Sequence, residues 1–181
     1  GAGVGNLTTE LARQVATVHA IEYDDALVRL LREQVRQHPN VNVVHCDALD
    51  YHPSAIDGAP MVKVVGNLPY SIATPLIIRS LDWREQLLLM VFTLQKEVAD
   101  RLVASPGTRS YGALTIAVQL HMRIEKVASV PRDAFFPVPG VDSAIVKLVP
   151  LPRPAVEVTD LEFFFALVRA AFAHRRKTLW N

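Results

Sequence analysis

Hydrophobic and polar positions alternate with two periods along the chain, and the change of period predicts strands and helices in turn. Short apolar runs typical of strands occur at residues 17–23, 41–47, 61–67 and 86–94. Segments with apolar residues every three or four positions, typical of helices, occur at residues 6–16, 24–38, 72–81 and 95–105. This alternation favours an α/β fold with a doubly wound, mostly parallel sheet.

Two of the predicted helices carry an apolar stripe. In residues 6–16 the stripe is formed by Leu7, Leu11 and Val15, at a spacing of four. In residues 24–38 one face carries Leu27, Leu30, Leu31 and Val35. Both patterns are typical of amphipathic helices.

The last third of the chain follows a different pattern. After a predicted helix at 113–122, two strands near 123–129 and 143–149 follow one another with no helix between them, which favours an antiparallel hairpin that closes the sheet. A proline-rich linker then leads to a helix with Asp160 as its N-cap. We therefore expect a first domain at residues 1–149, and a linker with the start of a helical domain at 150–181.

The first residues form a glycine-rich turn, and such turns normally follow a strand. We expect the first strand of the sheet to be missing, which leaves a gap at its centre, and the helical domain to be incomplete. The missing strand argues against activity of the chain as it stands.

Composition sets broad limits. A chain of 181 residues, with 50% hydrophobic and 20% charged residues, can bury one sizeable core and part of a second small domain. The single cysteine, Cys46, excludes an internal disulfide and fits a reducing cytosol. His45 and Cys46 are neighbours on a strand and should point to opposite faces, so no metal site is expected. No apolar run is long enough to span a bilayer. The net charge of +1 neither indicates nor excludes nucleic acid as a binding partner.

Chemical groups collect where the predicted strands end. Glycines at positions 1, 3 and 5 precede a helix, where the backbone can approach a ligand closely. Glu22 ends the next strand, where nucleotide-binding sheets place an acid on ribose hydroxyls, and Asp47 ends the following one, where it can accept from an adenine amino group. Asn67 ends the strand that comes after these two in the sequence. The line of groups predicts an adenosine-containing cofactor whose reactive end points at Asn67. A nucleoside triphosphatase does not fit, but a dehydrogenase remains possible.

Simpler readings of the same residues stay open at this point. The sequence NLPY (67–70) can be a proline turn with a core tyrosine, and Phe135 and Phe136 can be core residues, with Phe136 expected there. The basic run at 174–177 is typical of a solvated helix end. Arg101 can pair with Glu97, one helical turn earlier.

Several motifs nevertheless resemble one family. NLPY after a buried strand resembles the motif of S-adenosylmethionine-dependent methyltransferases that act on amino groups of nucleic acid bases. LQKEVADRL, YGALTIAVQ, FFPVPGVDSAIVKL and FAHRRKTLWN resemble bacterial small-subunit ribosomal RNA adenine dimethyltransferases of the KsgA type. The similarity covers nearly the whole chain and implies a Rossmann-like class I methyltransferase fold.

The resemblance also implies roles for individual residues. The glycines Gly1, Gly3 and Gly5 would line S-adenosylmethionine, with Ala2 at the position where the family usually has proline. Glu22 would bind the ribose hydroxyls, and Asp47 would accept from the adenine amine. Ala48 and Leu49 would pack on the adenine ring. Asn67 would contact the cofactor and, with the Leu68 carbonyl, accept from the target amine. Pro69 would fix the turn, and Tyr70 and Phe135 would stack on the flipped base. The expected RNA contacts are Lys96, Arg101, Arg109, Arg132, Arg175, Arg176 and Lys177.

The implied activity is dimethylation of two adjacent adenosines near the 3′ end of small-subunit (16S) ribosomal RNA, by a cytoplasmic monomer acting on an immature 30S subunit, away from any membrane. Two alternatives remain: a large-subunit (23S) RNA adenine methyltransferase of the macrolide-resistance type, and a non-catalytic, RNA-binding ribosome-assembly protein. The elements FxPxPxVxS and RRKTL favour the first assignment.

Overall fold

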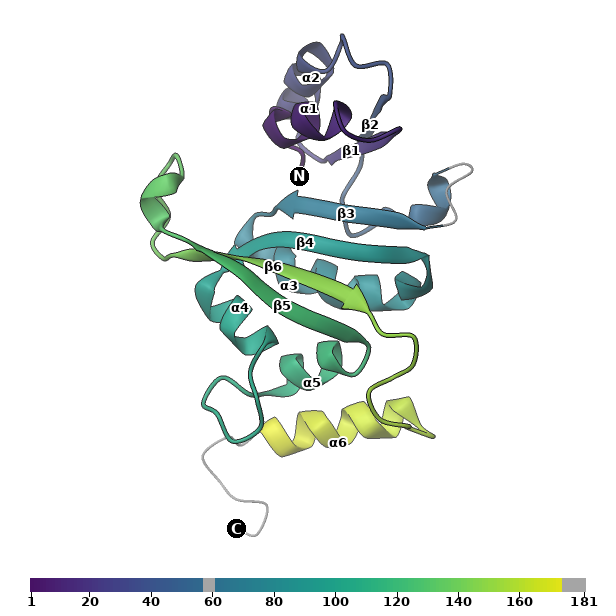
Figure 1. Cartoon of the computed structure of the whole chain (residues 1–181), viewed down its shortest axis with the longest axis vertical. Helices are drawn as coiled ribbons and strands as arrows, with labels where there is room; N and C mark the ends of the chain where they lie inside the picture. Colours follow the sequence, from purple (N-terminus) through teal and green to yellow (C-terminus); the bar gives the residue numbers. More distant parts are fainter. Residues whose placement is uncertain (57–60, 174–181) are drawn as a thin grey trace. The chain divides into compact units, whose positions relative to one another are not determined.

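The computed structural model describes residues 1–56 and 61–173. The chain divides into two units, Gly1–Thr93 and Leu94–Asn181. The α/β fold expected from the sequence is confirmed, since helices and strands alternate through the first unit (Figure 1).

The first half of unit 1 contains two helices and two parallel strands. Its elements are α1 (Asn6–Ala12), β1 (Val18–Glu22), α2 (Asp25–Gln34) and β2 (Val41–His45). Strands β1 and β2 pair in parallel, with Val18 opposite Val41 and Glu22 opposite His45. A small core of Ala20, Leu31 and Val35 lies between α2 and this strand pair.

The second half of unit 1 repeats the strand and helix alternation. It consists of a 3₁₀ turn η1 (Pro53–Ala55), β3 (Val62–Asn67), α3 (Tyr70–Ser80), a second 3₁₀ segment η2 (Leu81–Gln86) and β4 (Leu87–Gln95), whose last two residues belong to unit 2. Strands β3 and β4 are parallel, and their register places Asn67 opposite Thr93.

The strands belong to two separate ladders. Strands β1 and β2 form a two-stranded sheet, and the other four form a sheet in the order β3-β4-β6-β5 (Figure 1). Within the described residues, β1 and β3 are therefore not hydrogen-bonded to one another, and the parallel ladder is interrupted between them.

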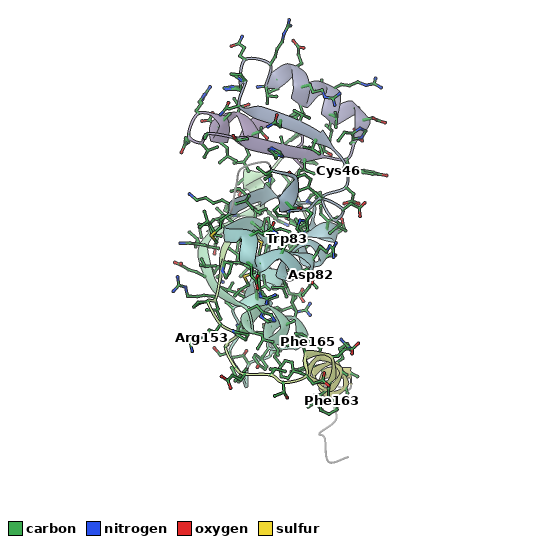
Figure 2. All side chains as sticks on the ribbon, turned by 90° about the vertical axis from the view of Figure 1, so that its right-hand side faces the viewer. Cys46, Asp82, Trp83, Arg153, Phe163 and Phe165 are labelled. Atoms are coloured by element: carbon green, nitrogen blue, oxygen red, sulfur yellow. The ribbon has the colours of Figure 1, made fainter. Side chains whose placement is uncertain are left out.

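Unit 2 contains α4 (Lys96–Leu102), α5 (Ala113–Gln119), β5 (Met122–Val130), the 3₁₀ turn η3 (Arg132–Ala134), β6 (Ser143–Pro150) and α6 (Leu161–Ala173). Strands β5 and β6 are antiparallel, which confirms the predicted hairpin. Asp160 caps α6 as expected, since its Oδ1 accepts from the Phe163 backbone N–H at 2.9 Å. Phe163 and Phe165 lie on different sides of α6 (Figure 2), and the Phe172 ring contacts Tyr111 with ring centroids 6.1 Å apart.

The predicted apolar stripes are partly wrong. In α1 the buried residues are Thr8 and Ala12, whereas Leu7 is 40% exposed. In α2 the buried residues are Val28 and Leu31, whereas Leu30 is 56% exposed. The face of a short helix that becomes buried depends on how it meets the sheet, so small side chains can take the contact while larger ones remain outside. No helix among the described residues has the length and apolar character needed to cross a membrane.

Candidate functional site

The loop before α1 needs glycine for two different reasons. Gly3 and Gly5 have positive φ angles of 59° and 96°, which side chains other than glycine rarely adopt. At Gly5 a Cβ atom would also lie only 2.7 Å from Leu31 Cδ1, on α2. The backbone of this loop can therefore pack on α2 and keep its turn only with glycine at position 5.

Glu22, the last residue of β1, holds this loop. Its Oε2 accepts a hydrogen bond from the Gly3 N–H at 2.8 Å, and its Oε1 accepts from the N–H groups of Tyr23 at 2.9 Å and Asp24 at 3.1 Å. The residue is only 6% exposed. Burial alone would raise the pKa of this carboxyl, but the backbone donors outweigh it and hold the pKa below its ordinary value. Glu22 is therefore a buried, ionised group at neutral pH.

Asp47 stands beside Glu22 because the ladder of β1 and β2 continues past their ends. The Cys46 N–H donates to the Glu22 carbonyl oxygen at 3.1 Å, which brings the next residue, Asp47, to the same edge. One oxygen of Asp47, Oδ1, accepts from the Leu49 N–H at 2.8 Å. Within the described residues no protein donor reaches Oδ2, so this oxygen can accept from a ligand.

The residues on either side of Asp47 are partly buried. Ala48 and Leu49 are half-buried. Burial raises the pKa of the neighbouring Cys46 thiol, and the carboxylates of Asp47 and Asp50 add to this effect. Cys46 is labelled in Figure 2. Its raised pKa makes it a poor nucleophile, and we assign it no chemistry.

The NLPY segment forms a tight connection from β3 to α3. Asn67 ends β3 and is exposed, the Leu68 side chain is buried, and Pro69 is the N-cap position of α3. Within the described residues the Asn67 side chain forms no hydrogen bond, so its amide oxygen is available as an acceptor. Tyr70 opens α3 and is half-buried.

Gly66 is a residue that the sequence analysis missed. A Cβ atom at this position would lie 2.9 Å from Leu68 Cδ2. Glycine at position 66 therefore lets the Leu68 side chain fold back against the strand and anchor the turn. A glycine directly before NLPY was the signal available in the sequence.

Three of the predicted groups meet at one place. A Cβ atom added at Gly1 would lie 3.6 Å from Pro69 Cδ and 3.7 Å from Glu22 Oε2. The start of the glycine loop, Glu22 and the NLPY turn are thus neighbours within unit 1. A side chain at Gly1 would therefore fill the space between Glu22 and Pro69.

The two phenylalanines lie in unit 2, and the structure corrects one expectation about them. Phe135 is half-buried, but Phe136 is 101% exposed and is not a core residue. Phe135 has extended backbone angles, with φ −116° and ψ 152°. Successive side chains of an extended segment point to opposite sides, so only one of the two can face the protein.

The predicted RNA contacts are distributed over unit 2. Lys96 and Arg101 lie on α4, Arg109 lies in the loop before α5, and Arg132 begins η3; all four are exposed. In the described part of the chain, no ion pair joins Arg101 to Glu97. The remaining residues of this set, Arg175, Arg176 and Lys177, lie outside the described residues.

The sequence and structure can be compared with known proteins. A family model described as "Ribosomal RNA adenine dimethylase" matches residues 1–181. A "Ribosomal RNA small subunit methyltransferase A" of Bacillus mycoides (strain KBAB4) is 46% identical over 186 aligned residues, which cover 100% of this chain and 64% of the relative. A second protein of the same name, from Bacillus cereus (strain B4264), has the same identity and coverage.

Two solved structures are also similar. A dimethyladenosine transferase from Plasmodium falciparum has a TM-score of 0.83 and 33% identity, over 99% of this chain and 63% of that one. The 23S rRNA methyltransferase ErmE has a TM-score of 0.76 and 32% identity, over 96% of this chain and 68% of that one. The chain thus has a class I methyltransferase fold and spans 64% of the length of the curated relatives that it matches. It belongs to the ribosomal RNA adenine dimethylase family.

Proposed function

We propose that this chain is the methyltransferase part of an enzyme that dimethylates two adjacent adenosines near the 3′ end of small-subunit ribosomal RNA. The observation that carries the proposal is the exposed Asn67 side chain at the end of β3, with Pro69 next to the glycine loop and Glu22. The names of the 46% identical relatives support the same substrate.

The donor in this proposal is S-adenosylmethionine, and the residues at the strand ends fit it. Glu22 uses its two oxygens for three backbone donors, and a carboxylate has about four lone-pair sites, so acceptor capacity remains for a ribose hydroxyl. Asp47 Oδ2 can accept from the adenine amino group, while Ala48 and Leu49 offer apolar contact to the ring. The bound cofactor supplies a methyl group on a sulfonium centre.

Asn67 and Leu68 would orient the target amine. The lone pair of an adenine amine is delocalised into the ring, which makes it a poor nucleophile. Two oxygen acceptors, the Asn67 amide oxygen and the Leu68 carbonyl, favour a more tetrahedral nitrogen and stabilise the positive charge that develops there. The proton becomes acidic once the nitrogen carries the methyl group, so no early general base is required. The remaining contribution is alignment of the amine for in-line attack.

The target base must leave its stack before it can react. Tyr70 offers a ring face at the start of α3, and base stacking on an aromatic side chain contributes about 1–3 kcal/mol. This is comparable with the few kcal/mol that unstacking costs. Phe135 remains a proposed second contact to the base.

The wider context is part of the same proposal. We place the enzyme in the cytoplasm as a monomer that acts on immature 30S subunits, with residues 150–181 as the start of a helical RNA-binding domain. Lys96, Arg101, Arg109 and Arg132 would contact phosphates, together with Arg175, Arg176 and Lys177.

A methyl-transfer assay tests the proposal. The protein is incubated with labelled S-adenosylmethionine and either immature small subunits or large-subunit RNA, and the modified nucleotides are mapped. We expect dimethyladenosine at two adjacent positions of the small-subunit RNA only. Transfer to large-subunit RNA instead would support the macrolide-resistance type, and RNA binding without transfer would support a non-catalytic assembly protein.

A further inference from the structure

Gly66 is the next-to-last residue of β3, and glycine is unfavourable inside a strand. It loses more conformational freedom on folding than any other residue and has no side chain to pack against its neighbours. Among the described glycines, positive φ angles occur only at Gly3, Gly5 and Gly107. The backbone conformation therefore does not require glycine at position 66, and the requirement must come from the space around it.

The space beside Gly66 is taken by Leu68. A Cβ atom at position 66 would lie 2.9 Å from Leu68 Cδ2, 3.2 Å from Leu68 Cγ and 3.5 Å from Phe92 Cδ1. Phe92 is the partner of Gly66 in the register of β3 and β4. It is fully buried, and Leu68 is only 7% exposed. An alanine methyl group at position 66 would therefore crowd two side-chain atoms of Leu68, which has little free space around it.

The Leu68 carbonyl oxygen depends on this packing. The proline that follows Leu68 disfavours helical backbone angles at position 68, so the Leu68 backbone has few alternatives. The Leu68 side chain is also restricted, because it is buried and can adopt only a few staggered rotamers. Pressure from a methyl group at position 66 is therefore relieved by a movement of the Leu68 backbone, and this movement turns the carbonyl oxygen as well.

Asn67 is separated from this contact although it lies between the two residues. Successive side chains of a strand point to opposite faces, and Asn67 is exposed whereas Leu68 is buried. The two proposed acceptors of the target amine are thus held in different ways. The Asn67 amide oxygen is on an exposed side chain, and the Leu68 carbonyl oxygen is on a backbone segment fixed by packing.

We propose that Gly66 is a positioning residue for methyl transfer. By leaving space for the Leu68 side chain, it directs the Leu68 carbonyl oxygen toward the target amine. The inference rests on the proposed methyltransferase function. Gly66 itself touches neither the substrate nor the reacting atoms, and its contribution is the alignment of an acceptor.

One substitution and a matched control test this role. Gly66→Ala should lower kcat for transfer to immature small subunits by about 10- to 100-fold, because a misplacement of about 1 Å can cost this much. The Kd for S-adenosylmethionine, measured by calorimetry, should stay within about twofold of the wild-type value, since Glu22 and the glycine loop are unchanged. Gly112 has an extended backbone, with φ −169° and ψ −172°, and no atom within 4 Å of an added Cβ. Gly112→Ala should therefore retain the wild-type kcat and Kd.

A double-mutant cycle identifies Leu68 as the group through which Gly66 acts. Leu68→Ala removes the packed side chain and should also lower kcat at unchanged cofactor affinity. When Gly66→Ala is added to Leu68→Ala, the further loss should be less than about twofold, because residues in contact are not additive. Leu68→Ala creates space instead of a clash, so it tests the inference even if Gly66→Ala is unstable.

Three results would overturn the inference. The first is a wild-type kcat in Gly66→Ala or in Leu68→Ala. The second is an equal fold loss from Gly66→Ala in the presence and absence of the Leu68 side chain. The third is a loss of cofactor affinity in Leu68→Ala that matches its loss of kcat, since this would indicate general damage to the site. Failure of the wild type itself to transfer methyl groups to RNA would instead overturn the proposed function.

Discussion

The Glu22 carboxylate accepts a hydrogen bond from the Gly3 backbone N–H at 2.8 Å. One residue therefore ties the end of β1 to the glycine loop and also stands where a ribose is expected. Since Tyr23 and Asp24 donate to the same carboxylate, the acid organises its surroundings before any ligand is present. Preorganisation of this kind lowers the entropy that the protein loses when a ligand binds.

Replacement of Glu22 should consequently affect both binding and folding. We expect Glu22→Ala to weaken binding of S-adenosylmethionine at least tenfold, because it removes an acceptor and releases the loop that should surround the cofactor. Three part-buried N–H groups also lose this acceptor, so the melting temperature should also fall. Calorimetric titration and thermal unfolding measure the two effects. Glu10→Ala, at an exposed position that pairs with Arg13, should change neither. Unaltered cofactor affinity in Glu22→Ala would contradict the assignment.

The stability that Glu22 contributes should depend on pH in a defined direction. The pKa of its carboxyl is lowered in the folded protein from an ordinary value of 4.5, because backbone donors outweigh burial. A lowered folded pKa means that the ionised form stabilises the fold above the unfolded pKa, and that this contribution is lost as the pH falls through the folded pKa. The difference in unfolding free energy between wild type and Glu22→Ala should thus be constant above about pH 5.5 and shrink below about pH 4.5. Denaturant titrations across this range measure it, and a difference that grew on acidification would refute the prediction.

Gly5 should be intolerant of a side chain, and the chain offers a matched control. Gly5→Ala introduces both an unfavourable φ of 96° and a Cβ contact of 2.7 Å to Leu31 Cδ1. Gly107 has a similar φ of 85° with no atom within 4 Å of an added Cβ. We expect Gly107→Ala to cost about 1–2 kcal/mol of backbone strain, and Gly5→Ala to cost about 1–3 kcal/mol more through overpacking. Equal losses in urea unfolding would show that the contact with Leu31 is relieved by a rearrangement.

The position of three candidate site residues at or just after strand ends could be predicted from the sequence. Glu22 ends β1, Asp47 follows two residues after β2, and Asn67 ends β3. The positions of strand ends follow from the hydrophobic pattern, whereas the division of the strands into two separate ladders does not. The exposure of Phe136 could not be predicted in this way, because hydrophobicity alone does not tell which of two adjacent phenylalanines faces the protein. That choice depends on the extended backbone at Phe135.

The sequence also did not predict correctly which face of each helix is buried, for a related physical reason. Leu30 belongs to the apolar stripe of α2 by spacing, but the buried residues of α2 are Val28 and Leu31, and Leu31 packs with Ala20 of β1. The contact with the sheet selects the buried face, and periodicity gives only the candidates. Gly66 was missed because its role depends on where the Leu68 side chain folds, which is a tertiary contact.

Asn67 provides the sharpest test of the catalytic proposal, because binding and transfer should separate there. Its side chain is exposed and has no hydrogen-bond partner within the described residues, so Asn67→Ala should leave the fold and cofactor affinity nearly unchanged. Removal of one preorganised polar contact to a developing charge typically lowers kcat by about 100- to 1000-fold. Single-turnover transfer to immature small subunits measures the rate, and calorimetry measures cofactor binding. Asn42→Ala, an exposed asparagine on β2, is the matched control and should transfer at the wild-type rate. If Asn67→Ala methylated at a similar rate, the amide oxygen would not be the acceptor that activates the amine, and the Leu68 carbonyl would have to act alone.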